Sequence, residues 1–301
     1  MICTPVKGLK YSVEKHNCRI DVIADWIEGS ALFESNRVSR SGVIDFLMSE
    51  QLYRNEDFAE EFVSIVWKEL KYRLKYGKIN ALSLDSKGVE RNDSWEMFPA
   101  YSFCLTLSLN DWCSRAESSY VVQGDLFERL TECSLRARGW RSLRTGWVPT
   151  RKVKLFDLIQ QISSHLNQPI GNQITQWVSS SNKDAGLDLI CDLPFLDSRG
   201  GHPIYFFQCA SGVHWNEKVA TPNLQIWEKL IDFSNSPVRG FSLPYVLNPH
   251  DFRSLSNRVN GILVDRLRLI GLPDGIDEWV DNDLQSDLIR WLSPRLDVLM
   301  S

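Results

Sequence analysis

The sequence predicts a globular α+β protein in which a helical N-terminal region precedes a block of mixed strands and helices. Its 301 residues, 43% of them hydrophobic and 24% charged, have the composition of an ordinary globular chain that can bury a sizeable core. Apolar residues recur at helical spacing in residues 19–76, and short runs rich in β-formers alternate with helical stretches after residue 184. This alternation predicts a central mixed sheet flanked by helices.

The N-terminal region contains two apolar stripes with the spacing of amphipathic helices. Their members are Val22, Ile23, Trp26 and Ile27 in the first stripe and Phe62, Val63, Ile65, Val66, Trp67 and Leu70 in the second. A polar, glycine-containing stretch at residues 80–93 interrupts the pattern before apolar residues return at 97–112. We therefore predict a helical domain at residues 1–120, with a role in contacting a protein partner or sensing a trigger.

The remaining residues, 121–301, are predicted to form a second domain with a mixed sheet. A helix is expected at 124–138, where apolar residues recur every three or four positions and Gly139 provides a stop. The other expected elements are a helix at 153–166, an antiparallel pair of strands at 187–193 and 204–208, a helix at 216–233, a strand at 241–247, a helix at 251–259, a strand at 261–269 and an acidic C-terminal helix.

Charge and cysteine content exclude several classes of protein. The net charge of −4 argues against a protein that coats nucleic acid through its overall charge, so any nucleic-acid site must be a local basic patch. Seven scattered cysteines without a Cys-x-x-Cys pair indicate neither a zinc ribbon nor a disulfide framework. No stretch approaches the roughly 18 apolar residues that a membrane span needs. We expect no membrane contact and a cytoplasmic location.

The strongest local excess of positive charge lies at residues 136–154. This stretch contains no acidic residue and carries Arg136, Arg138, Arg141, Arg144, Arg151, Lys152 and Lys154, interleaved with Trp140 and Trp147. Arginine and lysine contact phosphates, and tryptophan stacks on bases, so the stretch is a candidate DNA contact through Arg136, Arg138, Arg141, Arg144 and Lys152. The alternative is an ordinary solvated loop.

Oxygen-bearing side chains stand at the adjoining ends of the two strands predicted at 187–193 and 204–208. Asp188 lies near the start of the first strand and Gln208 ends the second, so a hairpin would bring the carboxylate and the amide together, and the Cys209 carbonyl would add a third oxygen. Phosphodiester cleavage with a divalent metal needs such oxygen ligands held close together. Asp192, four residues further along the first strand, is an alternative ligand.

Residues 183–188 (KDAGLD) and 205–209 (YFFQC) resemble the Asp-x-Gly-x-Asp and Gln-x-Lys strands of Mrr-like nucleases in the restriction-endonuclease-like PD-(D/E)XK superfamily. The helix at 124–138 resembles the first core helix of that fold, whose glutamate, here Glu128, often faces the metal. The similarity covers about residues 121–270. It implies a restriction-endonuclease-like core, binding of Mg²⁺ or Mn²⁺ by Asp188 and Gln208 with help from Glu128, and hydrolysis of DNA, often in prokaryotic restriction or anti-phage defence.

The sequence departs from this family pattern at Ala210, where the family has lysine. Our hypothesis is that Lys218, at the start of the next predicted helix, supplies the missing cation, which gives a catalytic set of Glu128, Asp188, Gln208 and Lys218. One alternative is a catalytically inactive nuclease-like module that binds DNA or acts as a scaffold. A third hypothesis is a helical interaction protein without a nucleic-acid role.

Two further patterns give weaker alternatives. Cys209 near His214 could form a nucleophile pair, but no third, orienting group is identifiable, and a cysteine beside aromatic strand residues is usually buried. His202 and His214 with Cys191 and Cys209 could bind zinc, although their spacing fits no compact zinc motif.

The acidic C-terminal helix is interpreted as a solvated amphipathic face, with partner docking as the alternative.

Overall fold

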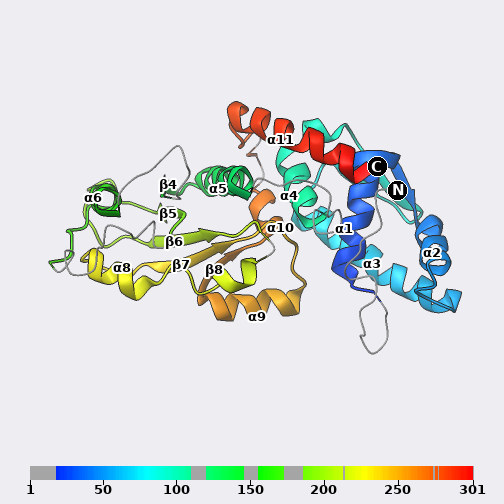
Figure 1. Cartoon of the computed structure of the whole chain (residues 1–301), viewed down its shortest axis with the longest axis horizontal. Coiled ribbons are helices and arrows are strands. Elements are labelled where there is room, and N and C mark those ends of the chain that lie inside the picture. The colour runs from blue at the N-terminus through cyan, green and yellow to red at the C-terminus, as the bar shows by residue number, and fades with distance from the viewer. Residues whose placement is uncertain are drawn as a thin grey trace.

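The protein is an α+β structure, as the sequence predicts. The computed structural model describes residues 18–109, 120–145, 155–172, 186–212, 214–273, 275–276 and 278–300. A five-stranded mixed sheet with helices on both faces stands beside a predominantly helical part formed by the first third of the chain and the C-terminal helix (Figure 1). Among the described residues, no helix combines the length and the apolar character needed to cross a membrane.

The helical part is built around a contact between two helices that the apolar stripes predict. Its helices are α1 (Ile20–Ser30), the π-helical turn η1 (Ala31–Ser35), α2 (Arg40–Ser49), α3 (Glu56–Tyr76), the 3₁₀ turn η2 (Trp95–Met97) and α4 (Pro99–Leu109). The buried residues of α1 pack against those of α3 and α4. The side chain of Asn55 caps α3 by accepting a hydrogen bond from the backbone N–H of Asp57, 2.7 Å away.

This region also contains a small sheet that the sequence analysis did not predict. The strands β1 (Arg37–Ser39), β2 (Leu82–Leu84) and β3 (Gly88–Arg91) pair antiparallel in the order β1-β3-β2. β2 and β3 form a hairpin within the stretch that was interpreted only as a break between helices. Strands of three or four residues are too short to give an alternating pattern, so the expectation of a purely helical region was wrong in this detail.

The large sheet has the order β4-β5-β6-β7-β8. Its strands are β4 (Arg141–Arg144), β5 (Leu189–Asp192), β6 (Ile204–Cys209), β7 (Val238–Ser242) and β8 (Gly261–Val264). β5 pairs antiparallel with β4 and β6, whereas β6, β7 and β8 run parallel to one another. The predicted antiparallel pairing of the two strands that carry Asp188 and Gln208 at their ends is therefore confirmed.

Helices cover both faces of this sheet (Figure 1). α5 (Tyr120–Ala137) packs on one face, and α6 (Leu155–Leu166), α8 (Leu224–Leu230) and α9 (Pro249–Val259) contribute to the apolar clusters on the other. Gly240 in β7 allows the ring of Phe207 in β6 to lie flat across it on the α5 side. A β-carbon at position 240 would come within 2.5 Å of that ring, so this packing requires glycine.

Several predicted elements differ in extent from the structure: the strand predicted at 241–247 is β7 (Val238–Ser242), and two others are interrupted early. β8 ends at Val264 because the Asp265 side chain accepts a hydrogen bond from the Arg268 backbone N–H (3.1 Å) and begins the helix α10 (Arg266–Ile270). The helix predicted at 216–233 is divided into the 3₁₀ turn η3 (Trp215–Lys218) and α8, with Pro222 between them. β4 lies inside the basic stretch, for which no strand was predicted.

The C-terminal helix α11 (Asn282–Met300) packs against α4 and α5. The ring of Trp291 makes an edge contact with Phe103 in α4, with 4.9 Å between the ring centroids. One face of α11 is buried through Leu284, Leu288, Trp291, Leu292, Leu296 and Leu299. The acidic helix therefore has the amphipathic character that was predicted, and its apolar face joins the main core.

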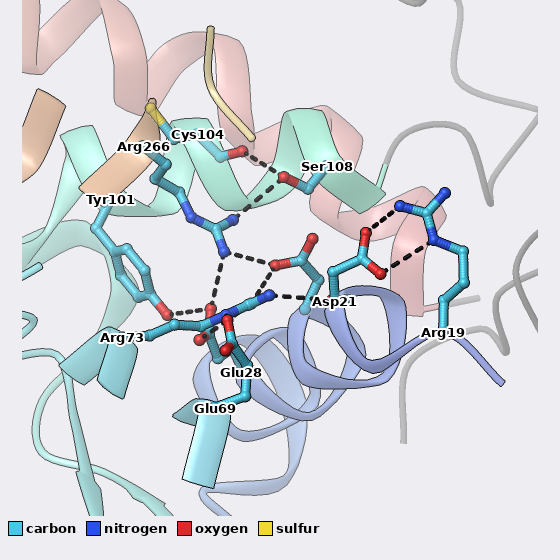
Figure 2. A network of polar contacts seen from close by, with 10 residues as sticks. Arg19, Asp21, Glu28, Glu69, Arg73, Tyr101, Cys104, Ser108 and Arg266 are labelled. Atoms are coloured by element: carbon cyan, nitrogen blue, oxygen red, sulfur yellow. Dashed lines mark hydrogen bonds and ion pairs between the residues drawn. The ribbon is translucent and has the colours of Figure 1, made fainter. Parts of the chain in front are cut away.

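A buried cluster of charges joins the helical part to the end of the sheet. Arg73 in α3 and Arg266 in α10 are both fully buried and share carboxylates on α1 (Figure 2). The Asp25 carboxylate lies 2.7 Å from Arg73 and 2.5 Å from Arg266. Glu28 lies 3.5 Å from Arg73 and 3.2 Å from Arg266 and accepts a hydrogen bond from the Tyr101 hydroxyl at 3.0 Å.

The two arginines remain charged in this cluster because carboxylates surround them. Burial acts to lower the pKa of Arg73, but Asp25, Glu28 and Glu69 more than offset it and raise the pKa above its ordinary value. Burial raises the pKa of Glu28, while the two arginines oppose that change. Because the charges are desolvated, each depends on the others, and removing one leaves an uncompensated charge in the core.

We expect Arg266→Met to lower the free energy of unfolding by about 3–5 kcal/mol, because Asp25 and Glu28 would lose one of their two buried cationic partners. Urea titration followed by circular dichroism measures the change. Arg290→Met on α11 is the matched control, because that exposed guanidinium pairs only with Asp287 among the described residues, and it should cost less than about 1 kcal/mol. Similar losses in the two variants would show that the buried cluster has no special importance for stability.

Candidate metal site

A cavity of about 490 Å³ opens where β5 begins and β6 ends, and it brings together all four residues of the predicted catalytic set. Glu128, Asp188, Gln208 and Lys218 line it. These residues come from α5, the start of β5, the end of β6 and η3, so four elements meet at one place. The first three side chains are buried, whereas Lys218 is exposed.

Asp188 is held rigidly by the sheet. Its backbone N–H donates to the Phe207 carbonyl (3.0 Å), and its own carbonyl accepts from the Thr145 N–H (2.9 Å), so the residue is anchored to both neighbouring strands. The carboxylate accepts hydrogen bonds from the Cys209 backbone N–H (2.7 Å) and from the Gln208 side-chain amide. Gly186, two residues earlier, has a φ of +72°, a left-handed conformation that glycine adopts without strain and that turns the chain into the strand.

Glu128 projects from α5 toward the same cavity, and its carboxyl group is unusually easy to protonate. Burial and the negative charge of Asp188 together raise its pKa to about 8, although Arg144 acts in the opposite direction. Two carboxyl groups that share a buried cavity resist being ionised together. A divalent cation between them would relieve this repulsion, so the electrostatics of the cavity fit a metal site.

The donor set is small but suits Mg²⁺ or Mn²⁺. Within the described part of the chain, no three histidine, cysteine, aspartate or glutamate side chains gather into a metal-binding group. Mg²⁺ commonly uses one or two protein carboxylates and fills its other positions with water and substrate phosphate, so Asp188 and Glu128 are sufficient. The Gln208 amide donates its N–H to Asp188, so this amide must rotate before its oxygen can join them.

The position of the missing lysine lies in the wall of the same cavity. Ala210 lines the cavity beside Gln208 and also packs in an apolar cluster that includes Phe241 and Leu243, so it brings no charge to the site. Lys218 stands at the rim of the cavity, on the last residue of η3. Its amino group forms no ion pair with any residue that the structure describes, so it is available to an anionic ligand.

Arg144 is a cation at this site that the sequence analysis assigned elsewhere. It was expected to contact nucleic acid, but its guanidinium pairs with Asp125 and lies 3.5 Å from Glu128. β4 places it there, because Arg144 is opposite Leu189, the residue that follows Asp188. The spacing of Asp125 and Glu128 by three residues on α5 would have indicated a shared partner, but without a predicted β4 nothing identified Arg144.

The other arginines of the basic stretch also have internal partners. Arg138 donates to the Ser134 carbonyl (2.9 Å) and to the Gly271 carbonyl (3.3 Å), and Arg141 pairs with Asp192 at 2.6 Å. Arg136 is exposed and lies 4.0 Å from Asp281. Lys152, Arg151, Lys154 and Trp147 lie outside the described residues. A phosphate approaching Arg141 or Arg144 would have to share the guanidinium with a carboxylate, so these two are poorly placed for the predicted DNA contact.

Asp192, the alternative metal ligand, lies at the opposite end of β5 from Asp188. It is fully buried, pairs with Arg141, and has His165 and His202 at 3.1 Å and 2.9 Å. Burial acts to raise the pKa of Asp192, but the hydrogen bonds from His165 and Arg141 outweigh it and lower the pKa below its ordinary value. A carboxylate already bound by Arg141 and hydrogen-bonded to His165 ties β4, β5 and α6 together, and it does not line the cavity at Asp188.

The cysteine-based alternatives do not fit the geometry. Burial raises the pKa of Cys209 well above its ordinary value, and the charges of Asp188 and Glu128 raise it further, so the reactive thiolate is suppressed. His214 is exposed and pairs with Glu217 at 3.1 Å. His202 lies beside Asp192 at the other end of the hairpin, so the four residues considered for zinc do not converge.

Glu128→Gln should change how stability depends on pH. The ordinary pKa of 4.5 applies in the unfolded chain and about 8 in the folded protein, so the folded state holds one more proton between these values. The contribution of this proton to the free energy of unfolding is complete below about pH 4.5. It is lost as the pH rises to about 8, and the free energy of unfolding falls by up to about 1.4 kcal/mol per pH unit. Glu128→Gln should therefore gain stability relative to wild type over this window.

Urea titrations in EDTA from pH 5 to pH 9 measure this difference. The exposed Glu228 on α8 provides the control substitution Glu228→Gln, which should follow the wild-type profile. Parallel profiles for wild type and Glu128→Gln would mean that Glu128 is already ionised in the folded protein.

Comparisons with known proteins leave the chain without an identified relative. No protein-family model matches it, and neither a curated protein nor a solved structure matches it. The geometry of the cavity and the resemblance of its motifs are therefore the basis for any assignment of function.

Proposed function

We propose that this chain is a metal-dependent nuclease that hydrolyses phosphodiester bonds in DNA at the cavity containing Asp188. The observation that carries this proposal is the convergence of Glu128, Asp188, Gln208 and Lys218 on one cavity. The resemblance implies metal-binding roles for Glu128, Asp188 and Gln208, and Lys218 is the hypothesised substitute for the missing lysine. Their meeting in one cavity supports this shared role.

The charges in the cavity indicate which residues bind the metal and which contact the substrate. The carboxylates of Asp188 and Glu128 would repel a DNA phosphate on their own, so the substrate needs a cation to approach them. Mg²⁺ or Mn²⁺ bound there supplies Lewis-acid stabilisation of the phosphate charge. Asp188 is fixed by the backbone N–H of Cys209 and keeps its orientation, while Lys218 at the rim can contact the charge that develops on the phosphate.

The architecture around the cavity supports the same proposal. A helix that carries the glutamate, an antiparallel hairpin that carries Asp188 and Gln208, and helices on both faces of a mixed sheet are what a restriction-endonuclease-like core requires of this region. The proposal includes the biological setting that the resemblance implies, a prokaryotic restriction or anti-phage system. The helical part would contact a partner or sense a trigger in that setting.

A second candidate function is a nuclease-like module that binds DNA without cleaving it. The alanine at position 210 favours it, because Ala210 lines the cavity without the positive charge that the family lysine would bring. This candidate predicts that DNA binding survives while turnover with Mg²⁺ or Mn²⁺ is absent. Cleavage assays with the wild-type protein separate the two functions directly.

Asp188→Asn should reduce metal-dependent cleavage by more than about 100-fold, since it removes the charged ligand while keeping its shape. Plasmid nicking and degradation of single-stranded DNA, each with Mg²⁺, Mn²⁺ or EDTA, measure the effect. Asp197→Asn in the hairpin loop is the matched control, because its carboxylate is exposed and pairs with Arg199. Equal cleavage by wild type and Asp188→Asn would place the activity outside this cavity or in a contaminant.

Lys218→Ala should lower the rate of cleavage by about 100- to 1,000-fold with little loss of metal binding, because Lys218 is assigned to the charge of the transition state. Single-turnover cleavage gives the rate, and Mn²⁺ titration gives the metal affinity. Lys229→Ala, an exposed lysine on α8, controls for the loss of a positive charge. A wild-type rate for Lys218→Ala would remove Lys218 from the catalytic set.

A further inference from the structure

A second cavity, of about 620 Å³, lies between the helical part and the sheet and is rich in aromatic side chains. Tyr72 and Tyr76 on α3, Trp140 before β4 and Phe252 on α9 line it. The two tyrosines are 44% and 55% exposed, and their ring centroids lie 4.7 Å apart. Aromatic surface that stays accessible at an opening of this size can stack on a planar ligand. We call this cavity the aromatic cleft.

Positive charge exceeds negative charge among the described residues that line the aromatic cleft. Arg138 and Arg268 line it, and Asp265 is the acidic residue among these described lining residues. The Asp265 carboxylate is buried and accepts the hydrogen bond from the Arg268 backbone N–H that begins α10, so it is already used as a helix cap.

The guanidinium groups themselves are held by neutral acceptors. Arg138 donates to carbonyl oxygens at the end of α10, and Arg268 donates to the Leu263 carbonyl (2.9 Å) while its guanidinium lies 4.5 Å from the centre of the Phe252 ring. No carboxylate of the described residues lies within ion-pair distance of either group. Burial lowers the pKa of Arg138, and the charge of Arg268 lowers it further, which reflects two like charges near one another. An anion would satisfy both.

We infer that the aromatic cleft binds a single-stranded segment of nucleic acid, with bases stacked on the tyrosine and tryptophan rings and phosphates held by Arg138 and Arg268. Single-stranded nucleic acid alternates planar bases with anionic phosphates, and the rings and guanidinium groups of the aromatic cleft complement both. In a duplex the base faces are covered by their neighbours, so the exposed rings of Tyr72 and Tyr76 select unpaired bases.

Helix α5 connects the aromatic cleft to the candidate metal site. Its first half contributes Gln123, Asp125 and Glu128 to the metal-site cavity, and Leu135 near its end lines the aromatic cleft. Glu128 and Arg138 are ten positions apart, which corresponds to about 15 Å along a helix. A strand held in the aromatic cleft would thus have neighbouring nucleotides near the carboxylates. The choice of a polynucleotide rests on the proposed nuclease function, whereas the stacking and charge argument does not.

The test measures binding in EDTA, so that no cleavage is needed. Fluorescence anisotropy follows a labelled thymidine oligonucleotide of roughly 20 nucleotides, longer than the typical 4–16 nucleotides of a single-strand site. We expect Tyr72→Ala with Tyr76→Ala to weaken binding by roughly 5- to 150-fold, the effect of losing one stacked base, without changing the salt dependence. Arg268→Gln should weaken binding and lower the slope of log K against log salt by about 0.7, the value for one lost phosphate contact.

Two matched controls separate the aromatic cleft from the rest of the surface. Phe58→Ala removes a 51% exposed ring from the same helix as the tyrosines, and Arg253→Gln removes an exposed arginine beside Phe252; neither residue lines the aromatic cleft. Both should bind as wild type does. Circular dichroism verifies that every variant is folded.

Three results would overturn the inference. They are wild-type protein that does not bind the oligonucleotide, tyrosine variants that bind within two-fold of wild type, and a loss in the variants that is equally large for duplex DNA. Because the readout is binding, intact binding together with absent cleavage would count against the proposed nuclease function and leave the aromatic cleft assigned. If the wild type cleaves DNA and the tyrosine and Arg268 variants bind as wild type does, the nuclease function stands and the aromatic cleft is not the binding site.

Discussion

The buried pairing of Arg73 and Arg266 with the carboxylates of Asp25 and Glu28 is the constraint on which the arrangement of the two halves depends. Arg266 is the first residue of α10 and directly follows Asp265, the cap that separates α10 from β8. The cluster therefore anchors the last strand of the sheet to α1 and α3. A desolvated charge tolerates few alternative packings, because every displaced partner leaves an unmatched charge. The helical part is thereby fixed to the sheet, and the aromatic cleft keeps its shape at their junction.

The same electrostatic reasoning distinguishes the two ends of β5. At one end the Asp192 carboxylate pairs with Arg141 and is contacted by His165 and His202, and the result is a closed structural contact. At the other end Asp188 shares a cavity with Glu128, and its charge and burial raise the pKa of Glu128 despite the nearby Arg144. A closed contact with Arg141 gives rigidity, whereas two carboxyl groups that share a cavity give a site that attracts a cation. The four residues of β5 therefore separate Asp188, which is suited to binding a metal, from Asp192, which has a structural role.

The sequence predicted those features that depend on local pattern. The periodicity of α5 and the density of β-formers in β6 predicted the elements that carry Glu128 and Gln208, the hairpin placed Asp188 beside Gln208, and the family resemblance assigned Glu128 to the same site. Features that depend on distant partners were not predictable. Arg144 belongs to the site through Asp125, 19 positions away, and the role of Arg266 depends on Asp25, which is 241 positions away. The short strands β1, β2 and β3 gave no alternation to detect, and a helix cap at Asp265 ended β8 early.

The contact between Gly240 and Phe207 has a consequence for how this protein can change. Phe207 immediately precedes Gln208, and its ring rests where the side chain at position 240 would be. A single methyl group there would displace the ring and move the end of β6, although it lies in a different strand and carries no charge. Position 240 is therefore constrained because it must have no side chain. Glycine has no reactive group, yet its substitution would disturb the candidate metal site by displacing the ring of Phe207.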